Sequence, residues 1–250
     1  MTGRSIRAWQ LCLVLTVGFF FPIMNSLRVF LGWLKPQPAT QSRFLLRISF
    51  QLLGIICLYV VLRCQGRGLG DIGFTGAIRL NELAHSFMLF FGAILSSAVA
   101  YLFVMSIYAL VGHAIPQPDN SAALFGTTMS IFPLLYVLIN PFHEELLVRA
   151  FLITETEWIF RNTLLGIIFS VVLQTSYHLY QGLPGAVSHV TAFLLFSFYF
   201  VRKRRILPVI LAHLYMDVSA FAIHFRYLHP ATHHGTAALQ DALLRVSRCA

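Results

Sequence analysis

Charged residues are scarce in this 250-residue sequence, and acidic residues are the scarcest of all. Asp, Glu, Lys and Arg together make up 11% of the chain, and only nine residues are acidic. Soluble proteins carry roughly 25% charged residues. With 58% hydrophobic residues and a mean hydropathy of +0.75, the composition excludes an ordinary soluble domain and predicts a polytopic membrane protein.

Cysteine is also sparse, and its pattern excludes a disulfide framework. Cys12 and Cys57 lie in apolar runs, Cys64 lies just outside one, and Cys249 is the penultimate residue. No C-x-x-C or zinc-like spacing is present. We interpret the cysteines as free thiols and small packing groups.

Apolar runs long enough to span a membrane occupy most of the chain. Crossing about 30 Å of hydrocarbon takes about 20 residues. The sequence predicts an all-α, polytopic transmembrane helix bundle with about seven spans, in the range of six to eight. The expected spans are 11–34, 44–62, 84–111, 122–140, 164–180, 184–201 and 206–225.

Two apolar segments need separate interpretation. The first run follows Arg4 and Arg7, but it is too long for a signal peptide and has no convincing cleavage site, so we expect a retained helix. The segment 141–158 is apolar at one end and acidic at the other. We expect it to continue the fourth span as a tilted or broken helix.

The net charge of +9 indicates orientation in a membrane and no nucleic-acid partner, because the basic residues are spread among loops and form no single patch. The excess of Lys and Arg favours a cytoplasmic N-terminus. We expect a multi-pass protein of a bacterial or archaeal plasma membrane, with the lipid bilayer as a partner. The basic residues expected on the cytoplasmic side are Arg4, Arg7, Arg63, Arg67, Arg79, Arg161 and the run 202–205.

Three short strings place ionisable groups inside apolar runs. They are E-E-x-x-x-R at 144–149, a histidine at position 178, and H-x-x-x-D at 213–217. Three of the nine acidic residues lie in these strings. Ionisable groups at membrane depth are costly, so they indicate a functional site.

Helix geometry assigns different tasks to the two adjacent glutamates. Residues four apart share a helix face, whereas neighbours point about 100° apart. Glu145 therefore faces Arg149 and is neutralised by it, while Glu144 is unpaired locally and suited to act as a general base on water. His178 and His213 are candidates to hold that water or stabilise an oxyanion. Asp217 lies one turn after His213 and could orient its ring or, if hydrogen-bonded, contribute a group on the oxyanion side.

Each of these features alone would fit a structural role equally well. A lone Glu-Arg pair can be a structural tie, and a lone histidine can satisfy one polar contact. The conjunction of these groups on three spans favours a functional site. A zinc-protease helix is excluded, because Leu147 stands where H-E-x-x-H needs its second histidine.

The strings EELLVR at 144–149, HLYQG at 178–182 and LPVILAHLYMD at 207–217 resemble the three motifs of the CPBP family. These are the CAAX-processing and bacteriocin-processing intramembrane proteases, also called the ABI family, which include the Ras-converting endopeptidase. The resemblance covers about 121–225, with matching motif order and spacing. It divides the chain into N-terminal helices with a Gly-rich connector (1–120), a catalytic helical core (121–225) and a polar tail (226–250).

The resemblance implies a membrane endopeptidase that cleaves near the C-terminus of a peptide or protein substrate with a C-terminal processing segment. By motif position, Glu144 would activate water, with His178, His213 and Asp217 as its catalytic partners. Glu145 and Arg149 match the family's structural pair. The family's second motif often has Phe four residues before its histidine, and Gln174 here puts substrate preference in doubt.

The protease type stays open between a glutamic and a metallo-endopeptidase. The favoured mechanism is a glutamate-activated water that requires no cofactor. Two histidines and a carboxylate could also bind zinc, and the ligands would then be Glu144, His178 and His213.

Two other function classes were weighed against the protease. A non-catalytic binding or immunity protein on the same scaffold is disfavoured, because none of Glu144, His178 and His213 is missing. A proton-coupled transporter is disfavoured, because the first half of the chain has no matching acidic span.

Overall fold

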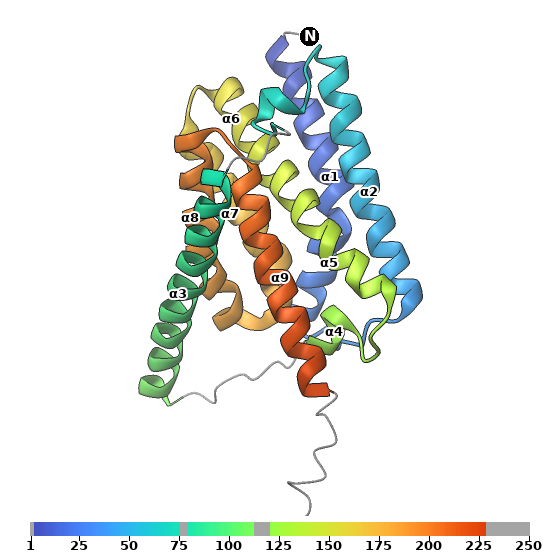
Figure 1. The fold of residues 1–250 in the computed structure, drawn as a ribbon, viewed down its shortest axis with the longest axis vertical. Coiled ribbons are helices and arrows are strands. Elements are labelled where there is room, and N and C mark those ends of the chain that lie inside the picture. Colours follow the sequence, from blue (N-terminus) through green and yellow to red (C-terminus); the bar gives the residue numbers. More distant parts are fainter. Residues whose placement is uncertain (1–2, 76–79, 113–120, 229–250) are drawn as a thin grey trace, which may run out of the picture.

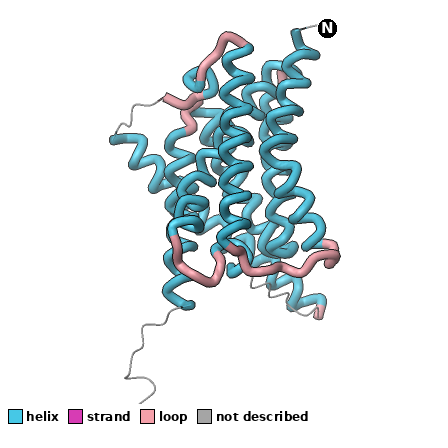
Figure 2. Tube along the Cα trace, turned by 90° about the vertical axis from the view of Figure 1, so that its right-hand side faces the viewer, coloured by secondary structure: helices cyan, strands magenta, loops and turns pink. Residues whose placement is uncertain are grey.

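The computed structural model describes residues 3–75, 80–112 and 121–228, and every regular element in these ranges is a helix (Figure 1). Most helices run along one axis, with the loops gathered at the two ends of the bundle (Figure 2). The predicted all-α bundle is therefore confirmed. The elements are α1 (Gly3–Phe30), α2 (Gln41–Cys64), η1 (Leu69–Ile72), α3 (Leu80–Val111), α4 (Ser121–Phe125), α5 (Ile131–Glu144), η2 (Glu145–Phe151), α6 (Leu152–Phe160), α7 (Thr163–His178), η3 (Leu179–Gln181), α8 (Gly182–Lys203) and α9 (Leu207–Leu228).

Six segments of the described residues are long and apolar enough to cross a membrane. One of them, Thr163–Lys203, is long enough to cross twice. Its two ends meet at Glu157, which accepts hydrogen bonds from the Thr163 hydroxyl and from Arg204, both at 2.8 Å. Because α7 and α8 also pack against each other, the chain turns back near η3. When α7 and α8 are counted as separate spans, the described residues have the seven spans that the sequence predicts.

The outer surface of the bundle is apolar, as a lipid environment requires. On α3, which packs against α8 and α9 and lies at the edge of the bundle in Figure 1, Met88, Leu95 and Phe103 are each about two thirds exposed or more. In water such a surface would be an aggregation hazard. The protein is therefore an integral membrane protein.

The fourth span begins later than the predicted 122–140. Helix α4 ends at Phe125, just before Gly126, which has a φ of +77°, and α5 begins only at Ile131. A side chain at Gly126 would place its Cβ 2.9 Å from the Ala39 carbonyl oxygen. The tight turn against the loop before α2 therefore separates α4 from α5, a tertiary effect that hydropathy does not register.

The segment 141–158 continues the fourth span, as expected, but the helix is not broken, because Ile131–Phe160 is continuous. Its irregularity is the π-helical turn η2, which widens the helix directly after Glu144. All seven residues of η2 are buried. Such π turns occur often at functional sites.

Two glycines let the N-terminal helices approach this segment. A Cβ at Gly18 of α1 would lie 2.6 Å from Leu147, and one at Gly54 of α2 would lie 2.8 Å from His143 Nε2. The end of α5 and the start of η2 are thus enclosed by α1 and α2.

In the C-terminal tail, the histidines at 229, 233 and 234 and Cys249 lie outside the described residues.

Candidate functional site

Glu145 and Arg149 form an ion pair at the centre of the bundle, as their spacing predicts. Both side chains are 0% exposed. Arg149 also donates to Gln174 Oε1 and lies over the rings of Phe193 and Phe196, at 5.6 and 5.2 Å from their centroids. A buried pair of this kind is stable only when both partners are satisfied. The pair therefore ties η2 to α7 and α8.

Glu144 points away from that pair and toward α7. Its Oε2 accepts hydrogen bonds from the Tyr177 hydroxyl at 2.7 Å and from Gln174 Nε2 at 3.2 Å. Its other oxygen has no hydrogen-bond partner among the described residues and is not completely buried. No cation of the described chain forms an ion pair with it. Glu144 is thus a carboxylate held on one side and open on the other.

His213 lies between two carboxylates. Its Nδ1 is 2.6 Å from Glu145 Oε1, and its Nε2 is 3.5 Å from Asp217 Oδ1. Glu145 therefore contacts Arg149 through one oxygen and His213 through the other. The carboxylate that the sequence assigns to support touches a predicted catalytic histidine.

Asp217 belongs to a second chain of hydrogen bonds. Its Oδ2 accepts from Asn140 Nδ2 at 3.1 Å, and Asn140 Oδ1 accepts from Gln51 Nε2 at 2.8 Å. Asn140 lies one turn before Glu144 on α5, while Gln51 comes from α2. The position of Asp217 on α9 is thereby fixed from two other helices.

His178 ends α7 and is attached to the site indirectly. Its Nδ1 lies 2.9 Å from the Gln174 carbonyl oxygen, and its ring packs against His189 and Phe193, with centroids 5.5 and 5.2 Å away. No hydrogen bond joins it to Glu144 within the described part of the chain.

Gln174 connects the two halves of the site. It is 0% exposed, and its amide accepts from Arg149 while donating to Glu144. The sequence singled out this position as a departure from the family pattern, and the structure gives it two partners. The backbone carbonyl oxygen of Gln174 also contacts the His178 ring.

Three contacting residues were missed by the sequence analysis: Tyr177, Asn140 and Gln51. Tyr177 shares a helix face with Gln174 at a spacing of three, and Asn140 shares one with Glu144 at a spacing of four. These spacings were visible as polar positions in apolar helices. Gln51 gives no such signal, because its partner lies 89 positions away.

The predicted zinc donors do not fit a metal site in this geometry. Nowhere in residues 3–75, 80–112 and 121–228 do three His, Cys, Asp or Glu side chains gather as a group that could hold a metal ion. Both nitrogens of His213 face carboxylates of the protein, and one oxygen of Glu144 is occupied by Tyr177 and Gln174. The mechanism without a required cofactor stays a prediction, with zinc as its alternative.

Part of the chain matches a known protein family. Residues 126–219 match the family model described as "Type II CAAX prenyl endopeptidase Rce1-like". The match contains Glu144, His178, His213 and Asp217, and it confirms the resemblance to this family that the three motifs predicted. No curated protein and no solved structure matches the chain.

Proposed function

Residues 126–219 relate this chain to the type II CAAX prenyl endopeptidases, and on that premise we propose that it is an intramembrane endopeptidase. The substrate is a membrane-associated protein or peptide, cleaved near its C-terminus. The observation that carries the proposal is Glu144, a buried carboxylate without a cation, anchored through Oε2 and open at its other oxygen.

Glu144 acts as the general base. It takes a proton from water, and the resulting hydroxide attacks the carbonyl carbon of the scissile peptide bond. The tetrahedral intermediate collapses with cleavage of the C–N bond, and protonated Glu144 returns the proton to the leaving amine. The Tyr177 and Gln174 bonds to Oε2 support this role, because they fix the direction of the free oxygen.

The histidines hold the water and the oxyanion. Donation of Nδ1–H of His178 to the Gln174 carbonyl leaves Nε2 of a neutral ring as an acceptor for the water. His213 is oriented by Glu145, and the longer 3.5 Å contact of its Nε2 with Asp217 leaves that N–H available to a developing oxyanion. All proposed steps use only side chains of this chain, with no step through a metal.

Gln174 is proposed as a positioning residue. It transmits the rigidity of the Glu145–Arg149 pair to Glu144 through one buried amide. A phenylalanine at this position, as the family often has, could make neither hydrogen bond. The catalytic core is assigned to 121–225, with the helices of 1–120 as its support.

The first test measures cleavage of CAAX peptides by the purified protein in lipid nanodiscs. Prenylated and unprenylated peptides are compared, and the C-terminal fragment is detected by mass spectrometry. Glu144→Gln is expected to reduce the rate at least about 100-fold, the lower end of general-base contributions. Equal cleavage by wild type and Glu144→Gln would rule out the proposed mechanism.

Matched controls separate chemistry from folding. Glu157 lies on the same long helix as Glu144 but at the end of the bundle, where its carboxylate pairs with Arg204. The Glu157→Gln variant is expected to keep full activity. Glu145→Gln is expected to lower stability as well as rate. A chelator titration on the same assay tests the metal: loss of activity that zinc restores would favour the metallo-endopeptidase.

A further inference from the structure

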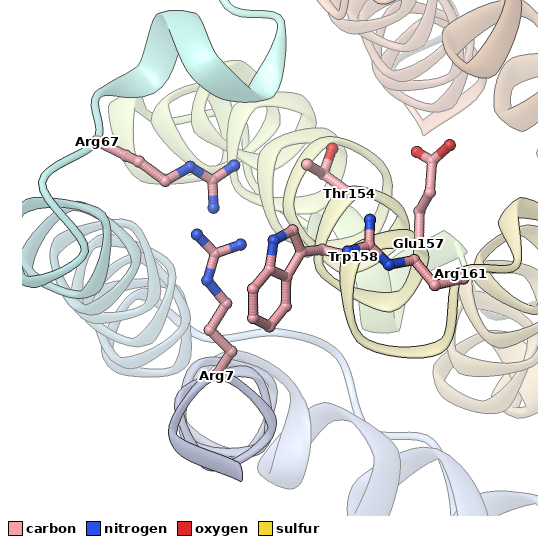
Figure 3. A pocket seen from close by; sticks show the side chains of 6 residues that line it. All are labelled: Arg7, Arg67, Thr154, Glu157, Trp158 and Arg161. Carbon is pink, nitrogen blue, oxygen red and sulfur yellow. The ribbon is translucent and has the colours of Figure 1, made fainter. Parts of the chain in front are cut away.

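A pocket of about 400 Å³ lies at the end of the bundle where α1 begins and α6 ends (Figure 3). Thr154, the lining residue nearest to Glu144 along the helix, is ten residues from it, or about 15 Å at 1.5 Å per residue. The pocket shares no lining residue with the candidate catalytic site. The residues lining the pocket are Arg7, Arg67, Thr154, Glu157, Trp158 and Arg161.

The carboxylates at this pocket are already neutralised. Glu155, which is 0% exposed and lies behind the lining, forms an ion pair with Arg67. Glu157 pairs with Arg204, with the atoms 2.6 Å apart. Each carboxylate thus already has a guanidinium partner.

One guanidinium group of the pocket forms only a long ion pair, and another forms none within the described residues. Arg7 approaches Glu155 only to 3.7 Å and lies over the ring of Trp158, 4.0 Å from its centroid. Arg161 is exposed, and its side chain has no hydrogen bond or ion pair within the described residues. In Figure 3 the guanidinium groups of Arg7 and Arg67 point toward each other beside the Trp158 indole. Three guanidinium groups thus line the pocket together with one carboxylate.

We propose that this pocket binds a phosphate group, supplied by the headgroup of an anionic phospholipid. Guanidinium forks bind phosphate oxygens in pairs and more strongly than a neutral donor does. Trp and Arg are characteristic of the membrane–water interface, where lipid phosphates lie, and basic pockets between transmembrane helices bind anionic headgroups. The proposal is independent of the proteolytic function.

The test measures lipid binding to the full-length protein by native mass spectrometry after release from nanodiscs. Phosphatidylcholine nanodiscs are compared with discs that contain phosphatidylglycerol. Arg161→Asn is the main variant, because its backbone φ of +56° suits Asn and its side chain has no partner to lose. We expect about tenfold weaker retention of phosphatidylglycerol, the loss for one charge-assisted hydrogen bond.

Arg202→Gln is the matched control, since Arg202 is exposed near the same end of the bundle but does not line the pocket. It is expected to retain the lipid like wild type, and equal loss in both variants would show a nonspecific surface effect and overturn the proposal. Inorganic phosphate added to phosphatidylcholine discs forms the second arm. Stabilisation by phosphate alone, absent in Arg161→Asn, would keep the phosphate site but reassign its source to a free anion. No binding in either arm would refute the site.

Discussion

At the residue scale, the site depends on how each buried polar atom is paired. Glu145 uses both oxygens on Arg149 and His213, whereas Glu144 uses one oxygen on Tyr177 and Gln174. Two adjacent residues of the same type are thus given different chemistry by their partners. The first two predictions test these pairings.

Gln174→Glu keeps an acceptor for Arg149 but removes the donor to Glu144 and puts a second carboxylate beside it. We expect kcat to fall about 10- to 100-fold with KM nearly unchanged, as expected when the orientation of a catalytic group is lost. Steady-state kinetics in nanodiscs measures both constants. Gln65→Leu removes another partly buried glutamine pair, with Gln10, and serves as control. Unchanged kcat in Gln174→Glu would contradict the positioning role.

Arg149→Met leaves Glu145 without its cation in the bundle centre. Removing one partner of a buried ion pair costs about 3–5 kcal/mol, so we expect a large loss of stability. The double variant Glu145→Gln with Arg149→Met is expected to recover part of it. Denaturant unfolding in detergent micelles measures the difference.

The Arg204–Glu157 pair provides the comparison, because its side chains are 45% and 34% exposed. Breaking it with Arg204→Gln is expected to cost under about 1 kcal/mol. Similar losses for the buried and the exposed pair would contradict the structural role of Arg149.

At the element scale, close helix packing positions the segment that carries Glu144 and Glu145, at the junction of α5 and η2. α1 and α2 contact η2 and the end of α5 through Gly18 and Gly54, and His143 fills the space between them. The ring of His143 also packs on Phe19, with centroids 4.9 Å apart. The π turn then directs Glu144 and Glu145 to different neighbours.

Gly54→Ala should disturb this packing. Its Cβ would lie 2.8 Å from His143 Nε2 and 3.3 Å from Gly18 Cα, so we expect a loss of about 1–3 kcal/mol by overpacking. Thermal unfolding in detergent measures it, and His143→Ala in the same chain should restore part of the loss. Gly70→Ala, where a Cβ meets nothing within 4 Å, is the control. Equal stability of the two alanine variants would disprove the close approach.

At the scale of the whole molecule, basic residues gather at one end of the bundle. The start of α1, the end of α2 and the end of α6 meet there through Arg7, Arg67 and Glu155, and the end of α8 joins them through Arg204 and Glu157. The positive-inside rule predicts that this end faces the cytoplasm. A cytoplasmic N-terminus therefore stays the prediction.

Thiol labelling can test the orientation. Cys64 is exposed and is the last residue of α2, at the basic end of the bundle. In a chain whose other cysteines are replaced by serine, a membrane-impermeant reagent is expected to label Cys64 only after cells are permeabilised. A cysteine placed at exposed Gln37, in the loop at the opposite end, should react in intact cells. The reverse pattern would invert the orientation.

The sequence by itself determined the membrane class, the helical fold, the Glu145–Arg149 pair and the resemblance to the family. These follow from composition, helical spacing and motif order, which are local properties of the chain. Only the tertiary structure decided that Gln174 joins Arg149 to Glu144, that His213 contacts Glu145, and that η2 is a π turn. Those contacts join residues 25 to 68 positions apart, and no periodicity encodes which of several polar side chains meet when separate helices pack.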